Sequence, residues 1–322
     1  MLVLGLQGSP RKKGNTSFLL SAFMKEAERL GALTQVVEVD KQNIVPCKEY
    51  IVCEKKGFCP IDDDMTHQIY PLLRRAEIVV AATPIFFYNT TAQLKALIDR
   101  SQTLWARKYK LQLTDPGRNI RRGFMLAVGA TKGKNLFEGL HLTAKYFFDA
   151  VGAQYAGSLT YRHVEHKGDM EKHPTVLADV KQAAEDLLEP LLNRKIILFA
   201  GQTDSCRSQM ASAFTQFLAG DKIEALSGGQ APADKIDSKM VEVMQERKID
   251  MAFRIPQSLE KAVSGIKPDI VVSLDQASGE ALYPEAENEK WALPEPAGGD
   301  LDAIRRLRDE IESKVKTLIG RL

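Results

Sequence analysis

The sequence lacks the features that mark several classes of protein. With only four cysteines in 322 residues, it is not a small secreted scaffold held by disulfides. It has no run of 18 apolar residues, and its N-terminus enters a predicted strand directly, so we expect neither a membrane-spanning helix nor a signal peptide. The net charge of +2 is too small to indicate nucleic acid or a membrane as a partner. We therefore expect a cytoplasmic protein that acts on small molecules.

The chain does have enough apolar sequence for two cores. Hydrophobic residues make up 44% of a chain longer than the usual single domain. Strand and helix signals alternate along the first half, which is typical of a parallel sheet with helices on both faces. We predict strands at 2–6, 34–39, 78–83, 123–128 and 155–161, and helices at 16–30, 66–75, 91–102, 136–151 and 175–192.

A second unit is predicted to begin near residues 190–195. The amphipathic helix at 175–192 has Pro190 near its end, and a new apolar strand, Lys195–Phe199, follows almost at once. The order of strand, loop and helix then starts again. We therefore predict an α/β protein made of two three-layer, doubly wound parallel-sheet domains, 1–192 and 193–322, with almost no linker between them.

The loop after the first strand has the composition of a phosphate site. The apolar run Leu2–Leu6 leads into small residues, hydroxyls and three cations, and Asn15 and Thr16 are suited to cap the helix that follows. Unpaired N–H groups at a helix N-terminus attract phosphate. The loop has no G-x-G-x-x-G, so it favours a terminal monoester phosphate over a pyrophosphate, and the alternative is an ordinary solvated turn. The candidate contacts are Ser9, Arg11, Gly14, Asn15, Thr16 and Ser17.

Two more loops follow predicted strands of the same sheet. The first holds three adjacent aromatics, which cannot all face one way from a strand, so at least one is expected in a pocket or an interface rather than in the core. The second holds Lys132, which either balances an anionic ligand or is a solvated lysine. The candidate contacts are Pro84, Ile85, Phe86, Phe87, Tyr88 and Asn89 in the first loop, and Gly129, Ala130, Thr131 and Lys132 in the second.

In this order, the three segments resemble the NAD(P)H-dependent FMN reductase and iron–sulfur flavoprotein group of the flavodoxin-like superfamily. The resemblance implies a sheet of order 2-1-3-4-5 with its ligand at the switch point. It also implies FMN on the residues just named, NADH or NADPH as co-substrate, a small electron acceptor such as a quinone or free flavin, and a homodimer. The alternative is a noncatalytic flavin protein that serves as an electron carrier or redox sensor.

Three of the four cysteines, Cys47, Cys53 and Cys59, lie close together in the sequence. Iron–sulfur flavoproteins carry a compact set of four cysteines in this place, and here Tyr50 stands where the second would be. A [4Fe-4S] cluster would lack one thiolate ligand, so we favour cysteines without a cluster and expect no metal. The acidic run Asp62–Asp64 is expected to cap the next helix rather than to bind a metal.

The second half opens with another strand, loop and helix. Its run Arg207–Met210 resembles the Cys-x5-Arg-Ser loop of the low-molecular-weight tyrosine phosphatase and arsenate reductase superfamily. In that superfamily the loop amides and the arginine hold an oxyanion, which a cysteine of low pKa attacks. The position of that cysteine, six before Arg207, is Gly201, so the resemblance implies a domain that has lost covalent chemistry. The candidate anion contacts are Ser205, Cys206, Arg207 and Ser208.

Other catalytic positions of that superfamily are also altered. The Asp-Pro of the general acid appears as Glu295-Pro296, and the resolving cysteines of the arsenate reductases would fall near Leu274 and Ala281. Two interpretations therefore stay open for the second domain, an oxyanion binder or sensor and a packing or dimerisation module. An active phosphatase or arsenate reductase is opposed by Gly201.

Overall fold

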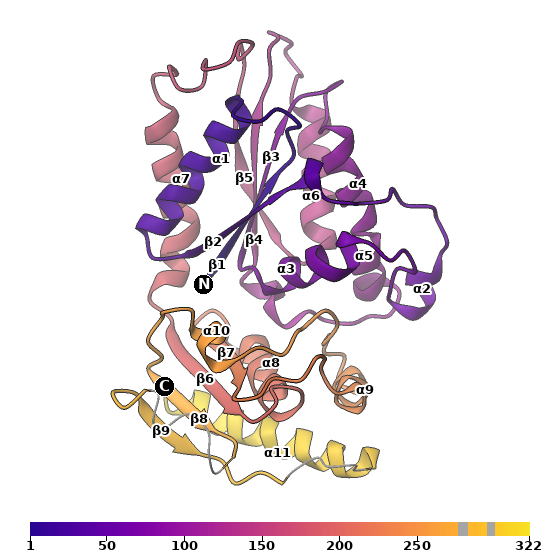
Figure 1. The fold of residues 1–322 in the computed structure, drawn as a ribbon, viewed down its shortest axis with the longest axis vertical. Coiled ribbons are helices and arrows are strands. Elements are labelled where there is room, and N and C mark those ends of the chain that lie inside the picture. The colour runs from indigo at the N-terminus through magenta and orange to yellow at the C-terminus, as the bar shows by residue number, and fades with distance from the viewer. Residues whose placement is uncertain (276–282, 295–299) are drawn as a thin grey trace. The chain divides into compact units, whose positions relative to one another are not determined.

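The computed structural model describes residues 1–275, 283–294 and 300–322 (Figure 1). These residues form two compact units. The first consists of Met1–Gln112 and Ile120–Leu192, and the second consists of Leu113–Asn119 and Asn193–Leu322. Each unit has a parallel sheet of its own, so the predicted α/β class with two parallel-sheet domains is confirmed.

The first sheet has five strands in the order β2-β1-β3-β4-β5, as predicted. Every pair of neighbours is parallel. In β1 and β3 almost every residue is buried, as expected for strands with helices on both faces. The strands are β1 Leu2–Gln7, β2 Leu33–Glu38, β3 Ile78–Pro84, β4 Arg122–Val128 and β5 Gln154–Tyr161.

Helices cover both faces of this sheet. Figure 1 shows α1 (Asn15–Arg29) and α7 (Val176–Leu192) on one face, with α4, α5 and α6 on the other. On the α1 face, Phe23 stacks on Phe124 of β4 with ring centroids 5.9 Å apart. The remaining elements of this unit are η1 Val39–Lys41, α2 Val52–Lys56, η2 Met65–Ile69, α3 Tyr70–Arg75, α4 Ala92–Arg100, α5 Gln102–Tyr109 and α6 Glu138–Ala150.

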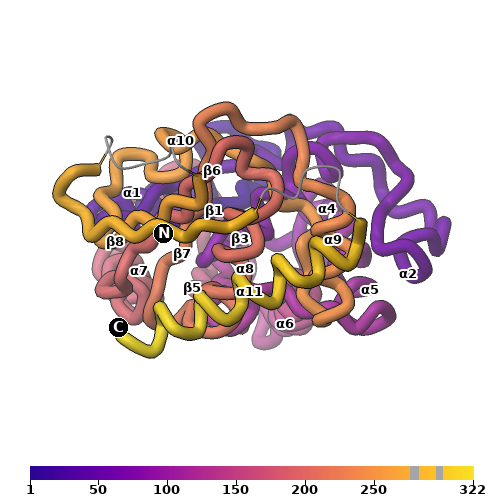
Figure 2. The backbone as a smooth tube through the Cα atoms, turned by 90° about the horizontal axis from the view of Figure 1, so that it is seen from below, coloured from indigo at the N-terminus to yellow at the C-terminus, as the bar shows by residue number. Residues whose placement is uncertain are grey.

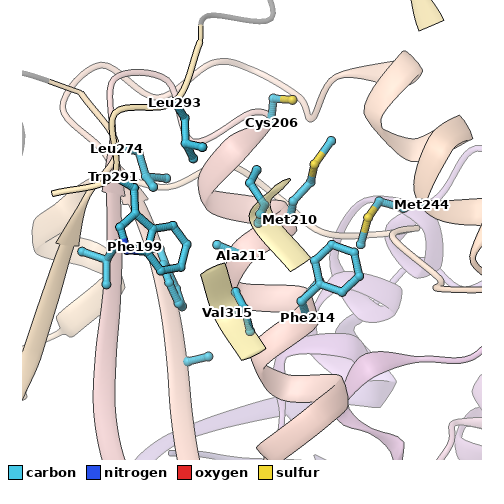
Figure 3. Packing of buried hydrophobic residues seen from close by; sticks show 14 of the residues in the cluster. Phe199, Cys206, Met210, Ala211, Phe214, Met244, Leu274, Trp291, Leu293 and Val315 are labelled. Atoms are coloured by element: carbon cyan, nitrogen blue, oxygen red, sulfur yellow. The ribbon is translucent and has the colours of Figure 1, made fainter. Parts of the chain in front are cut away.

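The second sheet has four parallel strands in the order β7-β6-β8-β9. Its main core lies between the sheet and helices α8, α9 and α11, and Figure 3 shows Phe199, Met210, Phe214 and Trp291 in it. Figure 2 shows α11 running along α8 and α9. The elements are β6 Lys195–Gly201, α8 Arg207–Ala219, β7 Ile223–Gly229, α9 Ser238–Glu246, α10 Leu259–Val263, β8 Ile270–Ser273, β9 Glu287–Lys290 and α11 Leu301–Gly320.

The short segment Leu113–Asn119 lies between α5 and β4 in the sequence, yet it belongs to the second unit. The Thr114 N–H donates to the Lys248 carbonyl at 2.7 Å, and the Asp250 N–H donates to the Thr114 carbonyl at 2.8 Å. The segment contains η3, Pro116–Asn119. The predicted domains, 1–192 and 193–322, place residues 113–119 in the first domain, whereas in the structure they belong to the second unit. Among the residues described, no helix is long and apolar enough to cross a membrane.

Candidate functional site

The three predicted ligand loops of the first unit leave neighbouring strands at the same edge of the sheet. The Gly8 N–H donates to the Ala82 carbonyl at 2.8 Å, which joins the end of β1 to β3. The Ile85 N–H donates to the Val128 carbonyl at 2.9 Å, which joins the end of β3 to β4. The carboxyl ends of β1, β3 and β4 therefore carry residues 8–17, 84–89 and 129–134 side by side, at the switch point of the sheet.

The start of the first loop is held against α4. A Cβ on Gly8 would lie 2.8 Å from Leu94 Cδ2 and 2.9 Å from the Ala82 carbonyl oxygen, so only glycine fits there. Thr91 caps α4 by accepting a hydrogen bond from the Leu94 N–H, and its hydroxyl donates to the Gly8 carbonyl at 2.6 Å. Helix α4, predicted at 91–102, thus fixes the position of the loop.

The N-terminus of α1 is open to a ligand. Gly14 is the N-cap and has no side chain, the first turn contains no acid, and within the described residues no side-chain cap is made there. The prediction that Asn15 or Thr16 is the cap is wrong. Helices α4, α9, α10 and α11 each have a side-chain cap, from Thr91, Asp237, Ser258 and Asp300 respectively. In α1 the partial positive charge of the helix end is reinforced by the exposed cations Arg11, Lys12 and Lys13.

Hydrogen bonds shape the rest of this loop. Gln7 Nε2 donates to Ser17 Oγ at 2.9 Å, and its Oε1 accepts from the Ser9 N–H at 3.2 Å. The Ser9 hydroxyl accepts from the Arg11 N–H at 3.3 Å. Gln7 is not among the predicted contacts, although a glutamine at the end of an otherwise apolar strand is a signal in the sequence.

Asn15 holds residues 166–170 against the loop that follows β1. Its Nδ2 donates to the His166 carbonyl at 2.8 Å, and its Oδ1 accepts from the Gly168 N–H at 3.1 Å and the Met170 N–H at 3.3 Å. Both polar atoms of the side chain therefore bond residues 166–170. The group that Asn15 can donate to a ligand at the helix N-terminus is its backbone N–H. Thr16 is buried beside it.

The second loop turns sharply and exposes its aromatics. Phe86 and Asn89 exchange backbone hydrogen bonds at 2.9 and 3.0 Å, and the two residues between them have positive φ, +48° at Phe87 and +63° at Tyr88. This is the geometry of a type I′ turn, which glycine and asparagine adopt at lower cost. Phe87 is fully exposed, and the other two aromatics are about half exposed. None of the three is in the core, so packing does not account for them.

The base of this turn is rigid. Asn89 Nδ2 donates to Thr143 Oγ1 in α6 at 2.9 Å. A Cβ on Gly139 would lie 2.7 Å from the Tyr88 carbonyl oxygen, so α6 approaches the turn as closely as a glycine allows. Strained, exposed aromatics on a fixed base are typical of a ligand site, since the fold gains nothing from them.

The third loop packs against the second. A Cβ on Gly129 would lie 2.6 Å from Leu136 and 3.7 Å from Ile85, and one on Gly133 would lie 3.4 Å from the Tyr88 hydroxyl. Ala130, Thr131 and Lys132 are exposed. The structure thus brings the second and third loops into contact and leaves the tip of the third in solvent.

In the second unit, the loop between β6 and α8 is built in a similar way. The N-cap of α8 is Cys206, again without a side-chain cap. Arg207 is buried, donates to the Leu293 carbonyl at 3.1 Å and forms an ion pair with Asp275. Ser208 donates to Asp204 at 2.7 Å, and the hydroxyls of Ser205 and Thr203 are 2.9 Å apart. The side chains of three predicted anion contacts are therefore engaged within the protein.

Asp204 organises this loop and was missed in the sequence. It is buried, has a φ of +50°, and accepts hydrogen bonds from Ser208, from Gln209 Nε2 at 3.0 Å and from the Gln257 N–H at 3.0 Å. Burial raises the pKa of this carboxyl, and the hydrogen bonds oppose that shift only in part.

Comparison with known proteins assigns each half of the chain to a family. Residues 1–158 match the model described as NADPH-dependent FMN reductase, and residues 196–322 match the model described as low molecular weight phosphotyrosine protein phosphatase. Each half of the chain thus matches a different family, and the second half belongs to the family of the arsenate reductases, which it matches over nearly their whole length. The resemblance drawn from its motifs is confirmed.

Named relatives agree with this division. The iron-sulfur flavoprotein of Methanosarcina thermophila is 38% identical over 112 residues, which are 35% of this chain and 58% of the relative. The chain spans about half the length of the flavoproteins that it matches. Arsenate reductase 1 of Staphylococcus epidermidis is 31% identical over 134 residues, which are 41% of this chain and 100% of the relative. A solved arsenate reductase in the phosphate binding state is 30% identical over 39% of this chain and 98% of that one, with a TM-score of 0.36.

The iron–sulfur flavoprotein relatives direct attention to the cysteines. Cys47, Cys53 and Cys59 are free thiols, the first exposed and the others partly buried. Burial, together with the neighbouring Cys59 and Cys47, raises the pKa of Cys53. Across the residues that the structure describes, no group of three or more His, Cys, Asp or Glu side chains is arranged to hold a metal ion.

A buried ion pair holds the segment that follows the three cysteines to helix α4 of the first unit. Asp63 contacts Arg100 of α4 through two hydrogen bonds, at 2.6 and 3.0 Å, and both side chains are at most 1% exposed. Burial opposes ionisation of Asp63, but bonds from Arg100 and from the N–H groups of Val45 and Met65 outweigh it and lower the pKa of the carboxyl. Asp63 accepts a hydrogen bond from the Met65 N–H at 3.1 Å, but Asp64, the N-cap of η2, makes no side-chain cap, so the capping expected of Asp62–Asp64 is not found. The pairing of Asp63 with Arg100 was missed.

The phosphatase-like unit departs from its family at the attacking position. Gly201, the last residue of β6, stands where the family has its cysteine, and a Cβ there would lie 3.5 Å from Asp275 Oδ2. Leu274 is buried in the core of the unit (Figure 3). Ala281, Glu295 and Pro296, the other positions singled out in the sequence, lie outside the described residues.

Proposed function

We propose that the first unit binds FMN and works as an NAD(P)H-dependent oxidoreductase that passes electrons to a small acceptor, such as a quinone or free flavin. The observation that carries the proposal is the open N-terminus of α1. It follows a loop of three cations, and a strained turn of exposed aromatics leaves the neighbouring strand at the same edge of the sheet, its switch point. A phosphate and a flat ring need these two kinds of surface.

The residues present fit FMN. The phosphate would lie on the first-turn N–H groups of α1, with Ser9, Arg11 and Ser17 around it, and Asn15 would contribute its backbone rather than its side chain. Gly14 adds no side chain that would compete for those N–H groups. The ring would lie against Pro84–Asn89, with residues 129–132 at its edge. FMN, when bound, supplies a ring that takes two electrons from NADH or NADPH and hands them to the acceptor.

The protein's own part is binding and orientation. The turn at Phe87 and Tyr88 offers apolar faces to the ring, and the loop amides offer fixed polar contacts to its edge. Lys132, exposed at the end of β4, would place a positive charge near the ring or near a phosphate of NAD(P)H. We assign no catalytic acid or base.

We further propose that residues 193–322 form a phosphatase-like domain without phosphatase or arsenate reductase activity. Gly201 has no side chain, so no covalent bond to phosphorus or arsenic can form at that position. The domain would act as a binding or dimerisation module for the FMN-binding domain at 1–192. The protein would be a homodimer that works in the cytoplasm.

The test is a titration followed by an assay of turnover. The full chain is mixed with FMN, quenching of flavin fluorescence is followed, and oxidation of NADH and NADPH is then measured with a quinone as acceptor. Saturable quenching with rapid oxidation supports the proposal. Saturable quenching with slow oxidation would favour an electron carrier or sensor instead, and absence of quenching would reject FMN as the ligand.

A further inference from the structure

The loop after β6 keeps the backbone arrangement of an oxyanion cradle. The carbonyl oxygens of residues 201, 202, 203 and 205 each accept a hydrogen bond from a backbone N–H within residues 230–237, at 2.9 to 3.1 Å. These carbonyls are turned toward that segment, so the N–H groups between them face the opposite side of the loop. In the part of the chain that the structure describes, no N–H from Gln202 to Ser205 donates a hydrogen bond. A row of such groups before a helix N-terminus binds anions.

A carboxylate of the same unit already lies at this cradle. Arg207, the first residue of α8, forms an ion pair with Asp275, and the two side chains are 8% and 16% exposed. The other carboxylate oxygen of Asp275 would be 3.5 Å from a Cβ on Gly201, which in turn would be 3.8 Å from Ser208 Oγ. Asp275 therefore lies between the end of β6 and the guanidinium, where an oxyanion held by the loop and Arg207 would lie.

Glycine at residue 201 leaves room beside Asp275, since a Cβ there would already be in van der Waals contact with Asp275 Oδ2. Any side chain there would extend toward the Asp275 carboxylate, and a cysteine thiolate would add a second negative charge beside it. Glycine removes both the bulk and the charge. The carboxylate offers Arg207 the paired oxygens that a phosphate would otherwise offer.

We propose that Asp275 is a built-in anion. The phosphatase-like unit is an oxyanion-binding domain kept closed by its own carboxylate, and it binds tetrahedral oxyanions such as phosphate or arsenate once that carboxylate is removed. The competition between the carboxylate and an oxyanion is electrostatic. Two anions compete for one guanidinium, and a buried arginine deprived of its partner is a strong attractor for an anion from solution.

The experiment compares phosphate binding by variants of the full chain. Wild type, Asp275→Ala and Asp275→Asn are titrated with inorganic phosphate by calorimetry, in a buffer free of other oxyanions. Glu285→Gln is the matched control, because Glu285 is an exposed acid of the same unit that forms a surface ion pair with Lys267 at 3.2 Å. We expect Asp275→Ala to bind phosphate at least tenfold more tightly than the wild type and the control. Asp275→Asn, which keeps the shape of the side chain, should show a smaller gain.

A double variant shows where the phosphate binds. The first unit has a phosphate loop of its own, so the gain must disappear when Arg207→Gln is added to Asp275→Ala. Unfolding midpoints with and without phosphate provide a second readout, and phosphate should raise the midpoints of the Asp275 variants more than those of the wild type and of Glu285→Gln. Equal affinity in the wild type and in both Asp275 variants would overturn the proposal, and so would a gain that survives the loss of Arg207. If Asp275→Ala does not fold, Asp275→Asn decides by the same criteria.

Discussion

A carboxylate at the N-cap of α1 should raise the stability of the protein and at the same time weaken its binding of FMN. Gly14 has an ordinary φ of −92°, and a Cβ there would be no closer than 3.5 Å to Arg11 Cβ, so Gly14→Asp fits without strain. Aspartate is a favourable N-cap residue that accepts first-turn N–H groups, and its charge complements the helix dipole. We expect the variant to be more stable than the wild type by about 0.5 kcal/mol.

The same carboxylate would occupy the N–H groups proposed for the FMN phosphate. Two unit charges about 5 Å apart, at an effective dielectric constant of about 20, repel by about 3 kcal/mol. This corresponds to FMN binding weaker by roughly a hundredfold. Gly14→Asn is the matched control, because asparagine occupies the same N–H groups without a charge and should give a smaller loss.

The assay is fluorescence titration with FMN, alongside urea unfolding of the apoprotein. Gly14→Asp should unfold at the same or a higher urea concentration while its Kd for FMN rises. A variant that keeps its affinity within twofold of the wild type would refute the assignment of the phosphate to α1. A variant that is also less stable would show that the site at Gly14 is not an open helix end.

Three further substitutions test other parts of the account. Phe87→Gly should leave the free energy of unfolding unchanged or raise it by about 1 kcal/mol, since glycine adopts positive φ without strain. The same variant should bind FMN more weakly. Urea unfolding and fluorescence titration measure the two effects. Gly8→Ala should cost about 1–3 kcal/mol, because its Cβ would overlap Leu94 and the Ala82 carbonyl, and a wild-type urea curve would contradict it. Asp63→Asn should cost about 3–5 kcal/mol by leaving Arg100 buried without its counter-charge. In the wild type, the lowered pKa of Asp63 means that this contribution is present above about pH 4 and is lost as the pH falls through the folded-state value, which acid titration of the unfolding free energy measures.

Much of the fold of the first unit follows from sequence because its signals are local. The strands β1 and β3 are continuous apolar runs that differ from the predicted bounds by at most one residue at either end. The strict alternation of strands and helices leaves few topologies, and the order 2-1-3-4-5 is among them. The loops at the ends of β1, β3 and β4 could be predicted to lie close together, because the carboxyl ends of parallel strands meet at one edge of the sheet.

Features that depend on distant contacts could not be predicted. Arg100 ends an amphipathic helix and has the pattern of an exposed residue, but Asp63, 37 positions earlier, takes it into the interior. The segment 113–119 has no marker of its own, and its backbone bonds to Lys248 and Asp250 assign it to the second unit. Asn15 has the chemistry of a cap, yet its side chain bonds residues 166–170, and it is the first residue of the helix with Gly14 as the N-cap.

The most direct test of the central claim compares FMN with riboflavin, which has the same ring and lacks the phosphate. The full-length apoprotein is titrated with each in the same buffer, and quenching of flavin fluorescence is recorded. If the N-terminus of α1 holds the phosphate, FMN will bind at least a hundredfold more tightly than riboflavin, with one FMN per chain. Equal affinity for the two, or no saturable quenching by FMN, would contradict the account.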